Sequence, residues 1–196
     1  MDEKFTSLKN LLIKLSSDPK FIHNKWFIEW HLNIVEQISL ELCDIYKDAD
    51  RDIVLGLVWM HDYAKVIDFD NEHNPDTIAK GASVLEEIGF DKTFIDKLMN
   101  YIEIFESKMS NDLSTAPIEV KIVSSADAAS HMVGPFFPLH WYENSNLSVE
   151  ELMQRNRAKL AKDWDRKIVL PEVKKAFQAR HDFLNEMFGG LPNKFF

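Results

Sequence analysis

The chain has 196 residues, of which 45% are hydrophobic and 28% are charged, and its formal net charge at pH 7 is −9. This length and balance are typical of one folded domain, exclude an intrinsically disordered chain, and argue against a nucleic-acid duplex as partner, since duplex binders usually carry a basic stripe. No window reaches the roughly 18 apolar residues that a membrane helix needs, and the single cysteine, Cys43, excludes an intramolecular disulfide, so we expect a soluble protein of the reducing cytoplasm.

Few glycines and long stretches without proline predict an all-α fold, a single-domain helical bundle over residues 1–196. The first helix is expected near Glu3–Leu15, and a second carries an apolar stripe at spacings of three and four. That stripe consists of Phe27, Trp30, Ile34, Ile38, Leu42 and Ile45. In the next segment, Asp52–Lys65, the run Ile53–Met60 is almost continuously apolar. Periodicity leaves strand or helix open there, and the helical surroundings favour a buried helix.

Polar connections and further helices alternate along the rest of the chain. The segments predicted as loops are Val66–Pro75, Asn111–Pro117 and the aromatic-rich Phe136–Leu147. The segments predicted as helices are Asp76–Ile88, Asp91–Lys108, Ile118–Met132, Ser148–Trp164 and Pro171–Phe188. A basic run from Arg155 to Lys167 is interrupted by Asp163 and Asp165. It is either a solvated helix face with internal charge pairing or an edge that faces a phosphate group.

Polar side chains interrupt two otherwise apolar helices. His31 follows Phe27 by four residues, so we expect it on the apolar face of the second helix. A histidine on such a face is either a satisfied core histidine or a ligand. His61 and Asp62 end the most apolar helix, where the helix dipole is negative, and a bound cation would stabilise a carboxylate at that end.

Asp127 belongs to a helix of small residues, Ser124–Ser130, which lets neighbouring backbones approach closely. It follows Val120 and Val123 at helical spacing, so its side chain is also expected to face inward. A buried carboxylate is costly unless it is paired or binds a metal. An ion pair with a buried lysine or arginine is therefore the alternative to a metal at this position.

The spacing of His31, the His61-Asp62 pair and Asp127 resembles that of the HD-domain metal-dependent phosphohydrolase superfamily. The resemblance implies that these four residues hold one divalent metal ion, and the mixed N/O donor set suits Mn, Fe, Co, Ni or Zn. It also implies an enzyme that hydrolyses a phosphate ester of a small molecule, such as a nucleotide, with a water molecule that the metal activates. A small phosphorylated substrate is then the expected partner, and oligomerisation is left open.

Further motifs carry this resemblance, which covers about residues 21–131. The sequence HDYAK at 61–65 is similar to the HD-x-x-K variant of the superfamily, and KGASVLEEIGF at 80–90 is similar to its Gly-Ala helix and the following turn. Residues 135–196 are expected to add C-terminal helices that complete the same core. The chain has a second His-Asp pair at 181–182, but no long apolar run precedes it and no partner follows it. We interpret that pair as a surface coincidence.

The resemblance also implies one ion rather than two. Dinuclear members of the superfamily add histidines from the loop and helices after the His-Asp pair, often from an Ile-x-x-His stretch. The matching stretch here is Ile102-Glu103-Ile104-Phe105, and a phenylalanine cannot bind a metal. His73 is the only histidine between Asp62 and Asp127, and a second ion would need more than one nitrogen.

Three residues near the expected metal are candidates for catalysis. Lys65, one turn after the His-Asp pair, is predicted to stabilise charge on the phosphoryl oxygens, and the alternative is a solvated lysine at a helix end. Asp70 is predicted to position the attacking water, although a turn-forming aspartate is the commoner explanation. His131 follows Asp127 by one turn and either contacts or protonates the leaving group, or packs at the helix end.

Two further interpretations stay open. Some members of the superfamily place an acid where Lys65 stands, so a metal-binding sensor or interaction module with weak turnover is the alternative to an enzyme. The aromatic residues after Pro135 either wall a pocket for a flat group or pack the C-terminal helices together. These residues are Phe136, Phe137, Trp141 and Tyr142.

Overall fold

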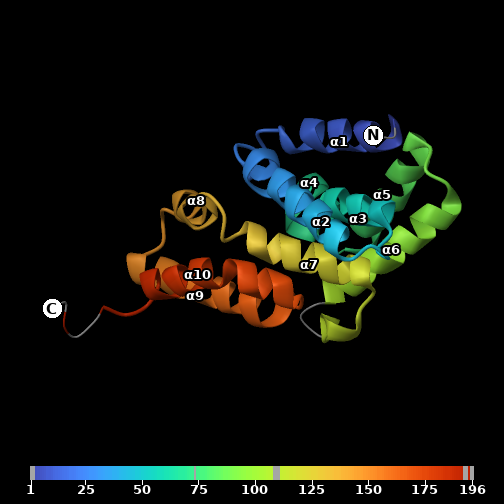
Figure 1. Ribbon diagram of the computed structural model, residues 1–196. Helices are drawn as coiled ribbons and strands as arrows, with labels where there is room; N and C mark the ends of the chain where they lie inside the picture. Colours follow the sequence, from blue (N-terminus) through green and yellow to red (C-terminus); the bar gives the residue numbers. More distant parts are fainter. Residues whose placement is uncertain (1–2, 73, 108–110, 192–193, 195–196) are drawn as a thin grey trace.

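The computed structural model describes residues 3–72, 74–107, 111–191 and 194, and these residues form helices and turns but no strands, which confirms the predicted all-α fold (Figure 1). The α-helices are α1 (Glu3–Ser16), α2 (Asn33–Ile45), α3 (Arg51–Met60), α4 (Tyr63–Ile67), α5 (Pro75–Ile88), α6 (Lys92–Glu106), α7 (Ile118–Ser130), α8 (Phe136–Glu143), α9 (Val149–Lys162) and α10 (Pro171–Met187). The π-helical turns are η1 (Ile28–Leu32) and η5 (Asp163–Lys167), and the 3₁₀ turns include η2 (Phe69–Asn71) and η4 (Leu113–Thr115). Within the described ranges, no helix combines the length and the apolar character needed to cross a membrane.

Helices α2, α3 and α7 pack against one another at the centre of the molecule. Figure 1 shows α7 running between the N-terminal helices and the pair formed by α9 and α10. The small residues of α7 explain how it can be covered on both sides. Ser124 Oγ donates to the Lys167 carbonyl, and Ser125 Oγ accepts from the amides of Val169 and Leu170. The segment that follows η5 is thereby fixed to α7, and the C-terminal helices belong to the same compact domain.

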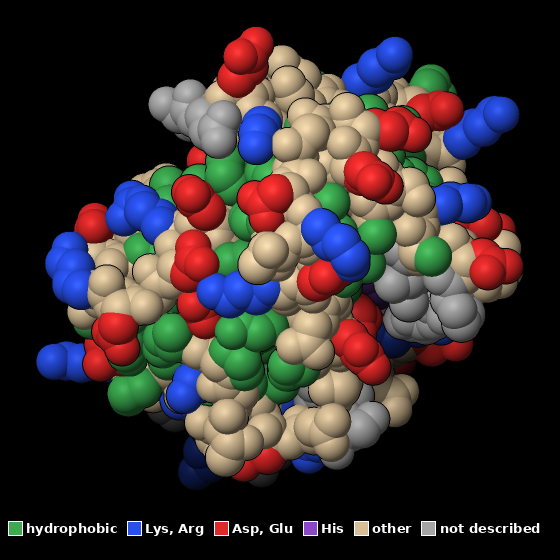
Figure 2. All heavy atoms as spheres, turned by 90° about the vertical axis from the view of Figure 1, so that its right-hand side faces the viewer, with side chains coloured by type: hydrophobic (Ala, Val, Ile, Leu, Met, Phe, Trp, Pro, Cys, Tyr) green, Lys and Arg blue, Asp and Glu red, His purple; other side chains and the backbone are tan. Residues whose placement is uncertain are grey.

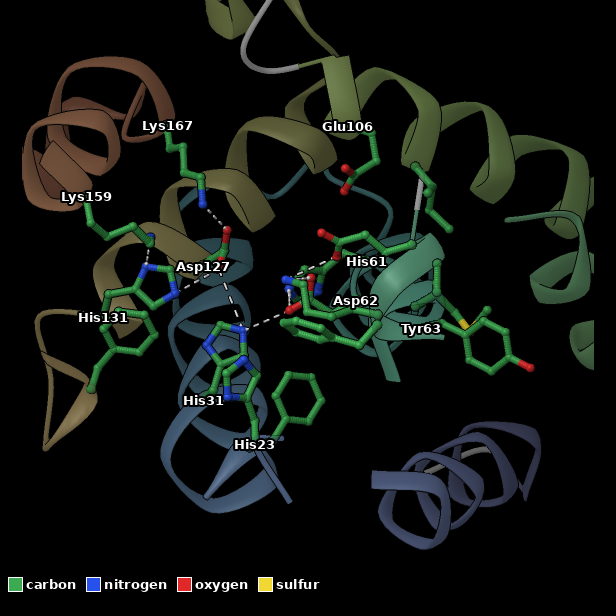
Figure 3. A pocket seen from close by; sticks show the side chains of 18 of the residues that line it. His23, His31, His61, Asp62, Tyr63, Glu106, Asp127, His131, Lys159 and Lys167 are labelled. Carbon is green, nitrogen blue, oxygen red and sulfur yellow. Dashed lines mark hydrogen bonds and ion pairs between the residues drawn. The ribbon is translucent and has the colours of Figure 1, made fainter. Parts of the chain in front are cut away.

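The predicted helix Asp52–Lys65 is interrupted at the His-Asp pair. Helix α3 ends at Met60, and Asp62 has φ −111° and ψ 12°, outside the helical region, before α4 begins at Tyr63. Adjacent side chains of an unbroken helix point about 100° apart. The break turns Asp62 so that its carboxylate and the His61 ring face the same space (Figure 3).

The buried face of the second helix differs from the predicted apolar stripe. Phe27 and Leu42 are buried as expected, but Trp30 and Ile45 are 39% and 57% exposed. The face that packs inward consists of Phe27, His31, Val35, Ser39 and Leu42. A π-helical turn over Ile28–Leu32 widens the helix, and such turns are frequent at functional sites. The shift in register buries His31, which is 3% exposed.

Two segments predicted as loops contain helices. Residues 136–143 form α8, which has no regular apolar period, so it could not be recognised from the sequence pattern. Pro138 is compatible with this helix because it lies in the first turn, where its missing N–H is not needed. The predicted loop Val66–Pro75 contains the end of α4, the turn η2 and the first residue of α5, whose N-cap Asn74 accepts a hydrogen bond from the Asp76 amide.

Acidic and basic side chains are interspersed on the face seen in Figure 2, with hydrophobic groups between them. The basic run on α9 and η5 divides between two environments. Its three arginines are exposed, but Lys159 and Lys162 are half-buried and Lys167 is buried, 6% exposed. The prediction of a purely solvated face is therefore wrong for Lys167 and for Asp163, which is fully buried.

Candidate metal centre

The four predicted ligands converge at the floor of one cavity, although they come from three separate parts of the chain (Figure 3). His31 lies in η1, His61 and Asp62 lie at the junction of α3 and α4, and Asp127 lies in α7. His31 Nε2 is 3.6 Å from Asp62 Oδ2 and 3.7 Å from Asp127 Oδ1, and His61 Nε2 is 3.6 Å from the same Asp62 oxygen. These separations exceed those of ordinary hydrogen bonds.

The other nitrogen of each imidazole is held by the protein. His61 Nδ1 lies 2.9 Å from the carbonyl oxygen of Val58, which can only accept, so Nδ1 carries the hydrogen. Ser130 Oγ donates to the Asp127 carbonyl at 2.7 Å and therefore accepts from His31 Nδ1 at 3.0 Å. In the neutral rings Nε2 then carries the lone pair that faces the carboxylates. Contacts of this kind orient metal-binding histidines in proteins.

Each carboxylate divides its oxygens between a lysine and the histidines. Asp62 Oδ1 accepts from Lys65 Nζ at 2.8 Å, and Asp127 Oδ2 accepts from Lys167 Nζ at 2.8 Å. Burial raises the pKa of both carboxyl groups, but the charge of the adjacent lysine and the nearby histidines outweigh this effect and hold both pKa values well below their usual range. Both groups are ionised, with one oxygen each directed to the cluster. The ion pair considered as an alternative for Asp127 is thus present beside the histidines.

The residues fit a transition-metal ion. Two overlapping groups have donor atoms within 4.8 Å of one another: His31, His61 and Asp62 in one, and His31, Asp127 and His131 in the other. Donors that share an ion at about 2.1 Å lie roughly 3.0–3.5 Å apart. Within each group the separations of 3.6 and 3.7 Å need only a small contraction, and an ion bound by all four predicted ligands would also draw Asp127 toward His61 and Asp62, which belong to the other group. Two kinds of donor, imidazole nitrogen and carboxylate oxygen, match the first-row divalent ions.

The cavity above this cluster has a volume of about 630 Å³. Cationic, acidic and apolar side chains line it. The lysines are Lys65, Lys159, Lys162 and Lys167, and the acids besides Asp62 and Asp127 are Glu72, Glu106 and Glu143. The apolar and aromatic part of the wall includes Trp26, Met60, Phe69, Met99 and Phe136. This volume and mixed lining are typical of small-molecule sites.

The structure brings two of the three predicted catalytic residues to the cavity. Lys65 and His131 line it, whereas Asp70 is exposed in η2 and is not among the lining residues. The turn geometry of Phe69–Asn71 directs Asp70 to solvent, so the structure gives no support to its predicted role. Of the aromatic residues after Pro135, Phe136 faces the cavity, and Phe137 is buried against Phe188.

Sequence reasoning missed the buried charges of η5. Asp163 Oδ2 lies 2.8 Å from His131 Nδ1 and 2.5 Å from Lys159 Nζ, and Asp163 Oδ1 lies 3.3 Å from Lys167 Nζ. Burial and the Lys159 charge lower the pKa of His131 to about 3, so its ring is neutral. Burial and the Lys167 charge lower the pKa of Lys159 to about 8. In the sequence, Lys159, Asp163 and Lys167 follow one another at i,i+4 spacing, which is typical of ion pairs on an exposed helix face.

The expectation of one metal ion rather than two was based on two positions, Phe105 and His73, and the structure describes the first of them. Phe105, which the sequence resemblance placed where dinuclear HD-domain proteins have an additional histidine, is buried and packs its ring against the His61 ring, with centroids 5.3 Å apart. His73, the other residue of that argument, lies outside the described residues. His181 and Asp182, the second His-Asp pair, lie on α10 and are not among the cavity residues.

Comparison with known proteins gives no relative for this chain: no family model, no curated protein and no solved structure matches it. The functional argument therefore depends on the site itself.

Proposed function

We propose that this protein is a metal-dependent phosphohydrolase of the HD-domain type that cleaves a phosphate ester of a small molecule. One observation carries the proposal: imidazole nitrogens of His31 and His61 and carboxylate oxygens of Asp62 and Asp127 converge at the floor of a cavity that lysines also line. A divalent ion held by these donors would supply a Lewis acid that polarises a phosphoryl group and lowers the pKa of water.

The lysines supply cationic groups for the phosphate. Lys162 lines the cavity and forms no ion pair with a carboxylate of the described residues, so its ammonium group can bind an anion. Lys65 uses one hydrogen on Asp62 and has further hydrogens for a phosphoryl oxygen. Charge that builds on those oxygens during hydrolysis would be stabilised by both groups.

The apolar part of the cavity supports an organic group on the substrate. Phe136 and Trp26 contact each other edge to face, with ring centroids 5.8 Å apart, and both line the cavity. Met60 and Met99 line it on the side of Gly81, where thioethers can adapt to different shapes. A flat group such as a nucleotide base is one candidate for this wall.

A panel of phosphate monoesters and diesters, assayed with Mn²⁺, Co²⁺, Ni²⁺ and Mg²⁺, tests the proposal. We expect turnover of at least one ester, its loss on chelation, and its loss in Asp62→Asn. Asp182→Asn alters the second His-Asp pair, which lies outside the cavity, and should keep full activity. If wild type binds metal but hydrolyses no ester, the sensor or interaction module becomes the better explanation.

The cellular location and the oligomeric state of this protein stay predictions. Cys43, the single cysteine, is buried in the core, where it acts as a small apolar residue. The reducing cytoplasm remains the location expected for such a chain, and size-exclusion chromatography with light scattering would establish the oligomeric state.

A further inference from the structure

His131 has the geometry of a fifth metal ligand. It lies one turn after Asp127 on the same face of α7, and its Nε2 is 3.5 Å from Asp127 Oδ1. The His131 ring is stacked on the His31 ring, with centroids 5.3 Å apart and planes 9° apart. His31, Asp127 and His131 form one of the two buried donor groups at the cavity floor. Figure 3 shows His131 beside Asp127, on the side of the cluster that faces Lys159.

The contacts of the other ring nitrogen determine the direction of the lone pair. His131 Nδ1 is 2.8 Å from Asp163 Oδ2 and 2.8 Å from Lys159 Nζ. If Nδ1 donates to Asp163, Nε2 has a free lone pair. If Nδ1 instead accepts from Lys159, the acceptor recorded near Nε2–H among the described residues is Asp127 Oδ1, at 3.5 Å, which is too long for a good hydrogen bond. A metal ion at Nε2 would select the first arrangement, in which Lys159 Nζ keeps Asp163 as its acceptor and turns away from the hydrogen on Nδ1.

Asp163 is built to hold this arrangement. Its side chain is fully buried, and its oxygens contact His131, Lys159 and Lys167. The two lysines offset the cost of burying its charge. A carboxylate that accepts from the outer nitrogen of a histidine is a common way to orient a metal ligand. His61 and His31 have corresponding contacts at Val58 and Ser130.

The two donor groups share His31, so an ion bound to His31 lies between them and can take ligands from both. His31 Nδ1 is engaged with Ser130, so only Nε2 can bind metal, and an imidazole nitrogen has a single lone pair. We propose that His131 Nε2 is a fifth protein ligand of the ion held by His31, His61, Asp62 and Asp127, and that Asp163 is the positioning residue that fixes its tautomer. This inference rests on the metal site of the proposed function and does not depend on the reaction.

Co²⁺ binding by the apo protein tests the inference, with affinity measured by chelator competition and ligand environment by the visible absorption spectrum. His131→Ala should change the spectrum and lower the affinity at least 10-fold. Asp163→Asn should lower the affinity about 10- to 100-fold, as loss of an outer contact typically does. His181→Ala removes a histidine that stacks on Trp164 outside the cavity, and it should match wild type in both measurements.

Each outcome has a distinct meaning. His131→Ala with wild-type affinity and spectrum would overturn the inference while leaving the four-ligand site intact. Wild type that binds no Co²⁺ would overturn the metal site itself, and with it the proposed function. Circular dichroism checks that the variants are folded. Should Asp163→Asn unfold, because Lys159 loses its carboxylate partner and Lys167 keeps only Asp127, His131→Ala retains those ion pairs and still decides the question.

Discussion

Lys65 contacts Asp62, a predicted metal ligand, and also lines the cavity. Its ammonium group lies 2.8 Å from Asp62 Oδ1 and 4.0 Å from Glu72 Oε2. Burial lowers the pKa of Lys65, but the Asp62 and Glu72 carboxylates outweigh it and raise the pKa above its usual value, so the side chain stays charged. It could act on the substrate directly, or only by holding Asp62, and the two roles differ in their effect on metal affinity.

We expect Lys65→Met to lower kcat/KM about 10²-fold or more, because a cation beside the phosphoryl oxygens is lost. The same variant should bind metal with nearly wild-type affinity, since Lys65 contacts the Asp62 oxygen that does not face the histidines. Steady-state kinetics and metal titration on one preparation measure both effects. Lys92→Met, at an exposed lysine that pairs with Asp96, is the matched control. A parallel fall in metal affinity would reduce Lys65 to a support for Asp62.

At the scale of residues, the sequence predicted which side chains form the site. It did not predict the contacts that orient those side chains. The resemblance carried by His31, His61, Asp62 and Asp127 implied that these four residues converge. The contacts at Ser130 and Asp163 could not be predicted, because they depend on how α7 faces η1 and η5. A serine in a run of small residues and an aspartate in a charged run carry no signal of such a role.

At the scale of elements, the π-helical turn η5 joins the C-terminal helices to the site. Lys167, its last residue, lies 2.8 Å from Asp127 Oδ2 and 3.3 Å from Asp163 Oδ1. Burial lowers the pKa of Lys167, but the two carboxylates outweigh it and hold the pKa above its usual range. Lys167 is therefore a buried cation that neutralises a carboxylate on each element, Asp127 on α7 and Asp163 on η5.

Replacing Lys167 by methionine should destabilise the fold by about 3–5 kcal/mol, the usual effect of leaving a buried charge without its partner. Urea unfolding in the absence of metal measures this. Lys175→Met, at an exposed position of α10, should change stability by less than about 0.5 kcal/mol. An apo Lys167→Met protein as stable as wild type would mean that the Asp127 and Asp163 charges are satisfied in another way.

Elements with a clear apolar period could be predicted from the sequence, and elements without one could not. Helices α1, α5, α6, α9 and α10 lie close to their predicted ranges. The end of the apolar helix at the His-Asp pair was predicted, but the start of α4 as a separate helix at Tyr63 was not, because no glycine or proline marks a break there. Helix α8 was missed because its own aromatic residues lie on several sides of the helix and form no single apolar face. The π-helical turn η1, which sets the orientation of His31, has no sequence signature.

At the scale of the whole molecule, the N-terminal and C-terminal parts of the chain build one cavity. The junction of α3 and α4 supplies His61 and Asp62, α4 supplies Lys65, and α9 and η5 supply Lys159, Lys162 and Lys167. The sequence predicted the all-α fold and an acidic chain. Net charge says nothing about which charges share a cavity, but one of the two interpretations of the basic run from Arg155 to Lys167 already placed it at an edge that faces a phosphate group.

Metal content is the measurement that tests the central claim most directly. Wild type, Asp62→Asn and Asp182→Asn, each incubated with Mn²⁺, Co²⁺, Ni²⁺ or Zn²⁺ and then dialysed, are compared by elemental analysis. We predict about one ion per chain in wild type and in Asp182→Asn, and a large loss in Asp62→Asn, because Asp62 Oδ2 lies 3.6 Å from Nε2 of both His31 and His61. Equal metal content in wild type and Asp62→Asn, whether high or negligible, would contradict the assignment of this site.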